Sequence, residues 1–214
     1  MGYIEIQDLN KIIKGKTILK NVNLSFEKGV IYGIIGSNGS GKTMLMKTLL
    51  GLVAPSGGKI TADEKAVRAG KPFPCSVGLM IENNSLWPEL SAVENLKLLA
   101  GIKNKVSDKE IKNAIRRVGL DSESKKPFSK FSLGMKQRLI LAQAIMEKPD
   151  ILILDEPTNS LDEAGIELLK KIMLEEKERG CLIIVSSHSP ELFDGIWDEI
   201  ITVKDGTFTQ KKGK

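Results

Sequence analysis

The pattern of hydrophobic and polar positions predicts several strands along the chain. Residues Tyr3–Leu9 and Val22–Phe26 alternate between apolar and polar side chains, which is typical of antiparallel strands with one buried face. A hairpin is predicted near the C-terminus, where two strand-like runs flank the turn sequence KDG. Other runs are continuously apolar, as expected for strands of a parallel sheet covered on both faces: Val30–Ile35, Ile151–Asp155 and Cys181–Ser187.

The middle of the chain predicts helices instead. Two serines are each followed three residues later by a glutamate, which is the pattern of a capping box: Ser91 with Glu94 and Ser107 with Glu110. A third helix is predicted to begin after Ser132 and to end before Pro149. We therefore predict one α/β domain over residues 1–214, with a mostly parallel core and an N-terminal antiparallel β-part in 1–85 and 149–214, and a helical subdomain in 86–148.

Composition restricts the possible functions. No apolar run approaches the roughly 18 residues that cross a bilayer, and the N-terminus resembles neither a signal peptide nor a myristoylation site, so a cytoplasmic location is expected. The net charge is +5, but basic and acidic residues are interspersed, and no basic stripe alternates with aromatic residues, so no nucleic-acid partner is expected. Cys75 and Cys181 form no CxxC pair and are predicted to be buried thiols.

A glycine-rich segment, GSNGSGKT, lies between the apolar run 30–35 and a helical pattern over 42–51. GxxxxGK[ST] between a strand and a helix is typical of a phosphate-binding loop, in which backbone N–H groups and the helix start face the anion and the lysine reaches the β- and γ-phosphates. A flexible turn is the alternative. We predict that nucleotide is bound by Gly36, Ser37, Asn38, Gly39, Ser40, Gly41, Lys42 and Thr43, with Lys42 also catalytic and Thr43 also a Mg²⁺ ligand.

Two adjacent carboxylates follow the apolar strand ILIL. Ligands bind at the C-terminal ends of parallel strands, which is where Asp155 and Glu156 stand. Alternation along the chain directs the two side chains differently, so they can have separate roles. We predict that Asp155 holds Mg²⁺ and that Glu156 is catalytic, orienting or deprotonating the attacking water.

The segment FSLGMKQR, residues 131–138, resembles the signature of the ATP-binding cassette (ABC) family, usually LSGGQ. The resemblance extends over essentially the whole chain and implies a P-loop NTPase of the ABC type with a RecA-like core. It implies that Ser132 and Gly134 contact the γ-phosphate of ATP held by a partner subunit, although an ordinary N-capped helix is the alternative for this segment. NSLD, ending at Asp162, is similar to the D-loop, and this resemblance implies that Asp162 contacts nucleotide. SSHS places His188 as the catalytic switch histidine.

Four positions depart from the family pattern. Leu133 and Met135 change the signature, and the SLGMKQR spelling is similar to the branch of bacitracin- and lantibiotic-type exporters. Glu82 stands near the position of the Q-loop glutamine and is expected to be a metal ligand. Ile13 stands near the position of the aromatic residue that stacks on adenine, so GTP use is a possible alternative to ATP.

The resemblance implies an ATP hydrolase with ATP and Mg²⁺ as cofactors, peripheral at the inner face of the cell membrane. Its partners are a second nucleotide-binding subunit and a separate membrane-spanning permease, and the cargo of the branch is a drug or antimicrobial peptide. Trp87 is either a docking contact for the permease or a residue packed under the helical subdomain. The alternatives are a soluble ABC ATPase acting in translation or on nucleic acid, and a nucleotide kinase or GTPase, which leaves FSLGMKQR and SSHS unexplained.

Overall fold

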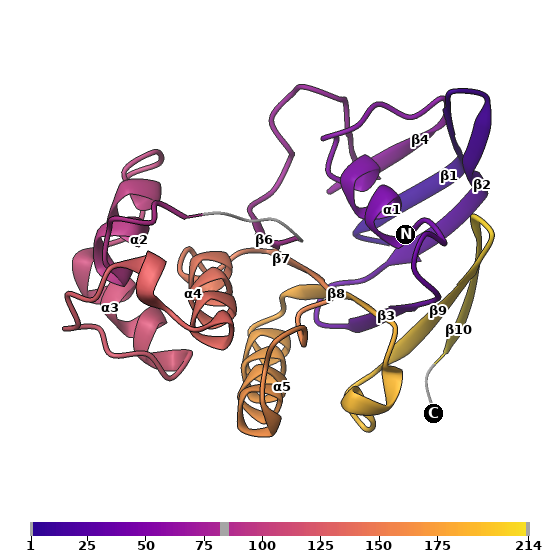
Figure 1. Ribbon diagram of the computed structural model, residues 1–214. Coiled ribbons are helices and arrows are strands. Elements are labelled where there is room, and N and C mark those ends of the chain that lie inside the picture. The colour runs from indigo at the N-terminus through magenta and orange to yellow at the C-terminus, as the bar shows by residue number, and fades with distance from the viewer. Residues whose placement is uncertain (1, 82–85, 213–214) are drawn as a thin grey trace.

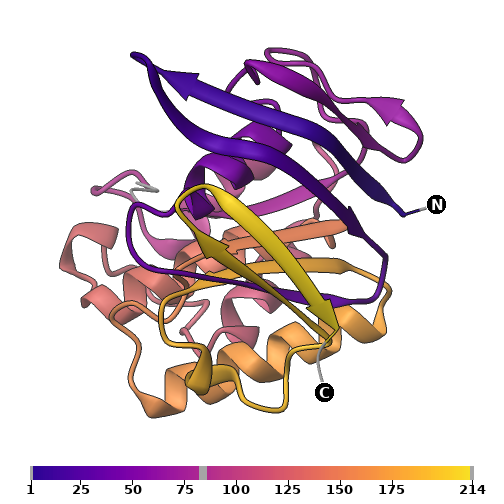
Figure 2. The same ribbon diagram turned by 90° about the vertical axis from the view of Figure 1, so that its right-hand side faces the viewer.

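The protein was analysed as a computed structural model that describes residues 2–81 and 86–212, and its strands form two sheets (Figures 1 and 2). The smaller sheet is antiparallel along β2–β1–β4–β5, where β1 pairs with both β2 and β4. Its strands are β1 (Ile4–Ile13), β2 (Lys16–Phe26), β4 (Gly57–Ala62) and β5 (Lys65–Ala66). We call it the antiparallel lobe.

The larger sheet has the order β10–β9–β3–β8–β7–β6. All its neighbouring pairs are parallel except the β9–β10 hairpin, which confirms the predicted fold class. The strand β6 was not predicted, because it is only four residues long and contains a glycine. The strands are β3 (Ile31–Ile35), β6 (Val77–Met80), β7 (Ile151–Asp155), β8 (Leu182–Ser187), β9 (Glu199–Lys204) and β10 (Thr207–Lys212).

The predicted helix starts are present. The hydroxyl of Ser91 accepts from the backbone of Glu94 and that of Ser107 accepts from Glu110, and both capping boxes are complete. The helices are α1 (Lys42–Leu49), α2 (Ala92–Ala100), α3 (Asp108–Arg117), α4 (Leu133–Ile145) and α5 (Glu163–Glu178), with short 3₁₀ turns at Phe128–Lys130 and Pro190–Phe193. Helices α2, α3 and α4 lie together beside the large sheet and are called the helical lobe (Figure 1).

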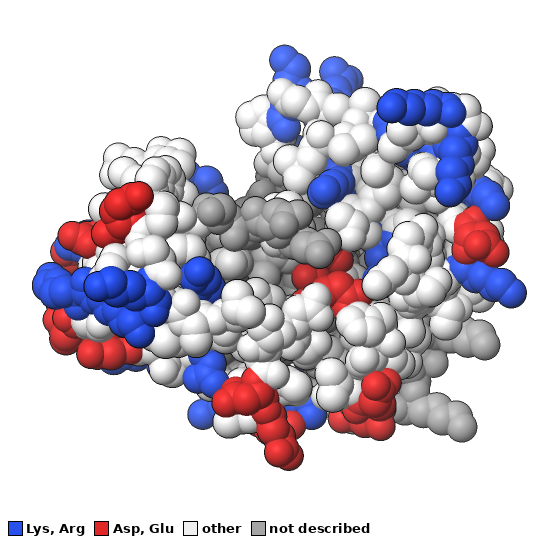
Figure 3. Space-filling model, in the orientation of Figure 1, with Lys and Arg blue, Asp and Glu red and all other residues white. Residues whose placement is uncertain are grey.

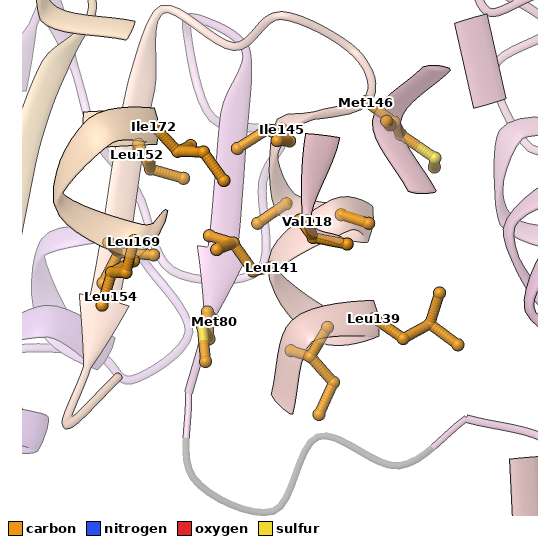
Figure 4. Close-up of a cluster of buried hydrophobic side chains, with 14 of the residues drawn as sticks. Met80, Val118, Leu139, Leu141, Ile145, Met146, Leu152, Leu154, Leu169 and Ile172 are labelled. Carbon is orange, nitrogen blue, oxygen red and sulfur yellow. The ribbon is translucent and has the colours of Figure 1, made fainter. Parts of the chain in front are cut away.

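The large sheet is buried on both faces, which explains the continuous apolar runs. Along β7, Leu152 and Leu154 pack with α4 and α5, whereas Ile151 and Ile153 pack with α1 and the antiparallel lobe. Figure 4 shows the first of these cores, where Leu141 of α4 lies beside Met80 of β6. The core of the helical lobe is therefore continuous with one face of the sheet, and the predicted limits at 85 and 148 stay a prediction.

The surface and the cysteines complete the description. Figure 3 shows basic side chains over the outer part of the antiparallel lobe and both signs of charge on the helical lobe, with a hollow between the two. Among the described residues, no helix is both long and apolar enough to cross a bilayer. Cys181 is buried as predicted, and burial raises the pKa of its thiol to about 12. Cys75 is only half-buried, so that prediction was wrong for Cys75.

Candidate nucleotide site

The phosphate-binding loop connects β3 to α1, as predicted, and two of its glycines are required by geometry. Gly41 precedes α1 with a φ of 113°, a conformation that L side chains rarely adopt. A Cβ atom on Gly36 would lie 2.6 Å from the carbonyl oxygen of Val203 and 2.9 Å from Ser40 Oγ. The loop therefore runs too close to the neighbouring strand β9 for a side chain at Gly36, and its backbone stays free to face an anion.

Lys42 is held at the centre of this loop and is only 6% exposed. Its Nζ donates to the carbonyl oxygens of Gly36, at 2.7 Å, and Ser37, at 3.3 Å. It also lies 3.2 Å from Glu156 Oε1. A buried ammonium group needs such partners, because the desolvation of an unpaired charge is costly. This position fits the predicted contact between Lys42 and a bound phosphate.

Asp155 lies at the end of β7 and is 3% exposed. One carboxylate oxygen accepts a hydrogen bond from Thr43 Oγ1 at 2.7 Å, and the other accepts from the hydroxyl of Ser186. Hydroxyl and carboxylate oxygens are the donors that Mg²⁺ prefers, and Mg²⁺ beside a nucleotide is usually held by one or two protein groups plus phosphate oxygens. Thr43 and Asp155 therefore fit the predicted metal role.

Glu156 sits between Lys42 and His188. Its Oε2 is 2.8 Å from His188 Nδ1 and also accepts from the backbone N–H of His188, at 3.3 Å. Its Oε1 is buried and, within the described part of the chain, accepts no hydrogen bond although Lys42 lies close by. The backbone of Glu156 has a φ of 50°, in the left-handed region, at a cost of about 1–3 kcal/mol. Strain of this kind is often found at functional sites, and it directs the carboxylate toward Lys42 and His188.

Lys42, Thr43, Glu156 and His188 meet at a cavity of about 460 Å³. Most of the predicted loop lines it, together with Glu156 and His188. The buried hydroxyl of Ser40 has no partner within the described ranges. The cavity is lined by Ile18, Ser37, Asn38, Gly39, Ser40, Gly41, Lys42, Thr43, Met44, Glu156, Asn159 and His188.

Three residues that were predicted to bind nucleotide or metal do not line this cavity. Ile13 is 38% exposed at the end of β1 and does not line the cavity, where Ile18 of β2 supplies an aliphatic wall instead, so its contact with adenine stays a prediction. Gly36 and Asp155 lie behind the lining residues, where they bond to Lys42 and Thr43. The expected metal ligand Glu82 lies outside the described residues.

Ser132 and Gly134, the residues predicted from the ABC signature, do not line the first cavity. Ser132 caps α4, and its hydroxyl accepts from the backbone N–H of Met135 at 3.2 Å. A second cavity, also about 460 Å³, forms at this helix start, and in the described chain it shares no lining residue with the first. It is lined by Ser132, Gly134, Met135, Arg138, Ser160 and Asp162. The structure therefore separates the predicted nucleotide contacts of one chain into two places.

Asp162 has a structural role in this second cavity. It caps α5 by accepting from the backbone N–H of Gly165, at 2.9 Å, and it pairs with Arg138 at 3.1 Å. The N–H of Gly165 and then the guanidinium of Arg138 lower the pKa of the Asp162 carboxyl. Asp162 lines the second cavity, so its predicted contact with nucleotide belongs there and not at the phosphate-binding loop.

Sequence reasoning missed four residues of the site. Ile18, Met44 and Asn159 line the first cavity, and Ser186 bonds to Asp155. The signal for Ser186 was present, because two serines end the apolar run of β8 at the edge where ligands bind. Within the described residues, no three His, Cys, Asp or Glu side chains gather as a metal cluster.

Comparison with known proteins identifies the family. The model of a family described as ABC transporter matches residues 19–159. The uncharacterized ABC transporter ATP-binding protein YybJ of Bacillus subtilis is 50% identical over 95% of this chain and 93% of its own length. The lantibiotic transport ATP-binding protein SrtF of Streptococcus pyogenes is 38% identical over 98% and 90%. The bacitracin transport ATP-binding protein BcrA of Enterococcus faecalis is 37% identical over 97% and 68%.

Solved ATP-binding cassettes share the fold. A dimeric cassette in a post-hydrolysis state, bound to ADP and Pi, has a TM-score of 0.86 and 25% identity over 98% of each chain. The cbiO1 protein of Clostridium perfringens, part of the ABC transporter complex cbiONQ, has a TM-score of 0.83 and 28% identity over 99% of this chain and 88% of that one.

The chain belongs to the ABC transporter family and is an ATP-binding protein of that family. The comparisons confirm the ATPase class that the motifs predicted, and the resemblance to bacitracin- and lantibiotic-type transport proteins. The alternative of an ABC ATPase acting in translation or on nucleic acid is not favoured.

Replacing Lys42 by alanine is predicted to lower nucleotide affinity by about 100-fold or more, because a phosphate loses a charged hydrogen-bond donor in a desolvated loop. Titration with a fluorescent ATP analogue measures the loss. Lys47→Ala, in the last turn of the same helix, is the matched control and should bind as the wild type does. Unchanged affinity in Lys42→Ala would show that the loop is not the phosphate site.

Proposed function

We propose that this chain is the ATP-hydrolysing subunit of an exporter for a drug or antimicrobial peptide, and that two such subunits pair head to tail around two ATP molecules. The observation that carries the proposal is the separation of the two cavities. A triphosphate in the first cavity meets Lys42 and Glu156 but not Ser132 or Gly134 of its own chain. A second subunit, turned head to tail, supplies these residues and completes the enclosure.

The second cavity has the chemistry of an anion site. The start of α4 presents free backbone N–H groups, and Gly134 lies so close to the loop before α5 that a Cβ atom would be 3.0 Å from the Ser160 carbonyl oxygen. Arg138 also lines this cavity, where it is paired with Asp162. Nucleotide bridges the two subunits through charge-assisted hydrogen bonds, and the bridge is lost when the γ-phosphate leaves. The dimeric cassette bound to ADP and Pi supports the pairing of two subunits.

Hydrolysis follows from the groups that surround Glu156. In the structure, Lys42 lies beside Oε1 while His188 holds Oε2. A triphosphate attracts Lys42 away from the carboxylate, which leaves Oε1 free to accept a proton from a water molecule. The water oxygen then bonds to the γ-phosphorus as the bond to the bridging oxygen breaks, giving ADP and phosphate. His188 keeps the carboxylate directed at the water.

Mg²⁺ belongs to this proposal as a cofactor held by Thr43 and Asp155. When bound, it neutralises charge on the β- and γ-phosphate oxygens. The close pairing of the Thr43 hydroxyl with the Asp155 carboxylate keeps two oxygen donors together at the end of the phosphate-binding loop.

Trp87, in the segment before α2, is suited to docking a partner protein. The side chain of buried Asn95 holds the backbone of Trp87 by accepting from its N–H, at 2.8 Å, and donating to its carbonyl oxygen, at 3.1 Å. The indole nevertheless stays 45% exposed. A fixed backbone that presents a large apolar side chain to solvent is suited to a partner, so we place the membrane-spanning permease here and the chain at the inner face of the membrane.

Glu156→Gln is predicted to slow hydrolysis by at least about 100-fold, because the general base is removed, while ATP still binds. ATP then persists between the subunits, and a dimer should elute from gel filtration with ATP but not with ADP. The wild type run under the same conditions is the control. A variant that stays monomeric with ATP, yet hydrolyses ATP at the wild-type rate, would contradict the assignment.

Ser132→Asp should prevent this dimer when combined with Glu156→Gln. Aspartate caps a helix as well as serine does, so α4 is kept, but its charge repels the triphosphate of the partner. Ser132→Asn is the matched neutral cap and should dimerise. Both double variants should bind one ATP per chain equally well, and loss of binding in the aspartate variant alone would place Ser132 in its own chain's nucleotide site.

Detergent extracts of membranes test the permease partner. The tagged chain should recover a membrane protein with several spanning helices, and Trp87→Ala should recover much less because the exposed indole is lost. Leu52→Ala removes another exposed apolar side chain, 58% exposed, and should behave as the wild type does. Recovery of ribosomes instead would favour the alternative function in translation.

A further inference from the structure

We propose that Ser186 is a positioning residue whose single hydroxyl sets both acidic residues of the nucleotide site. The inference rests on the proposed roles of Asp155 and Glu156. Ser186 is completely buried near the end of β8, and the parallel register places it directly opposite Asp155 of β7. It therefore reaches the acidic pair from the neighbouring strand, and it is not among the residues that line the nucleotide cavity.

The hydrogen bonds of Ser186 have one possible direction. A serine hydroxyl carries a single hydrogen, and Ser186 Oγ donates it to Asp155 Oδ1. The same oxygen then accepts the backbone N–H of Glu156 at 3.0 Å. The chain of bonds runs from the Glu156 backbone through Ser186 to Asp155, and bonds ordered in this way strengthen one another.

On Asp155, this bond fixes the carboxylate from the side opposite Thr43. Oδ2 accepts from Thr43 at 2.7 Å, and Oδ1 accepts from Ser186. Because Asp155 is only 3% exposed, bulk water has little access to replace a missing donor. With both oxygens held, the carboxylate has one orientation toward the end of the phosphate-binding loop.

On Glu156, the same hydroxyl holds a strained backbone. The N–H of Glu156 is shared between Ser186 Oγ, at 3.0 Å, and the Ser186 carbonyl oxygen, at 3.2 Å. These bonds fix the residue at its φ of 50°, the conformation that directs its carboxylate to Lys42 and His188. Without the hydroxyl, one of the two bonds is lost and the carboxylate is held less precisely.

Ser187 provides a matched control. It is the next residue of β8 and is equally buried, but its hydroxyl accepts from the backbone N–H of Ser189, at 3.0 Å. Adjacent residues of a strand project to opposite faces, so the two serines have different surroundings. Removing either hydroxyl deletes one buried oxygen from the same strand, but only Ser186→Ala removes bonds to the acidic pair.

The experiment compares Ser186→Ala, Ser187→Ala and Ser186→Thr with the wild type. Loss of a group that orients catalytic residues typically costs about 10- to 100-fold, so the kcat of Ser186→Ala should fall by that factor while the KM for ATP changes by less than about threefold. Ser186→Thr keeps the hydroxyl and should recover most of the kcat. Ser187→Ala should stay within about twofold of the wild type.

Two measurements do not depend on turnover. In the nucleotide-free protein, hydrogen exchange at the Glu156 amide should be faster in Ser186→Ala than in Ser187→Ala, because one acceptor is missing. The affinity for an ATP analogue in EDTA should match the wild type within about twofold, since the loop contacts do not involve Ser186. The gain in affinity on adding Mg²⁺ should be smaller in Ser186→Ala, because Asp155 is less well fixed.

The outcomes separate the inference from the proposed function. If Ser186→Ala retains the wild-type kcat and the wild-type exchange at Glu156, or if Ser187→Ala loses as much activity, the positioning role is wrong. Glu156→Gln is run in parallel. Rapid hydrolysis by Glu156→Gln would overturn the proposed function itself, whereas a slow Glu156→Gln with a fully active Ser186→Ala would overturn only the role of Ser186.

Discussion

The site depends on the parallel register of three neighbouring strands. β3 pairs with β8 up to Ile35 and Ser187, and β8 pairs with β7 up to Ser186 and Asp155, so the three strands end at one edge of the sheet. The chain then leaves each strand into a functional segment: the phosphate-binding loop, the acidic pair, and the segment with His188. Thr43 and Asp155 are 112 residues apart in sequence and 2.7 Å apart in space because of this register. A shift by one residue would turn Asp155 to the other face of the sheet.

Burying charged groups at the edge of the sheet costs free energy, and hydrogen-bond and charge partners within the site offset this cost. Lys42 and Asp155 are both almost fully buried, and each has several hydrogen-bond or charge partners. The strained Glu156 backbone is compensated in the same way by Ser186. The apolar faces of β7, covered by α4 and α5 on one side and by α1 on the other, supply the stability that tolerates this arrangement.

The two cavities support the proposed pairing of two subunits around nucleotide. One cavity offers a lysine, a carboxylate and a histidine, and the other offers a helix start, a close backbone and an arginine. Each is suited to only part of a triphosphate. In the proposed dimer, splitting the enclosure between two chains makes their association depend on the nucleotide, which would allow binding and hydrolysis to move the proposed membrane partner.

The sequence by itself determined the strand and helix types, the capped helix starts, the phosphate-binding loop and the acidic pair. These features are local, since they follow from hydrophobic period, turn chemistry and short spacings. Tertiary structure alone decided that β6 completes the sheet, that Ile18 rather than Ile13 lines the cavity, and that Ser186 joins Asp155 to Glu156. These outcomes depend on which strands pair and in which register, and pairing between distant segments leaves no local pattern in the chain.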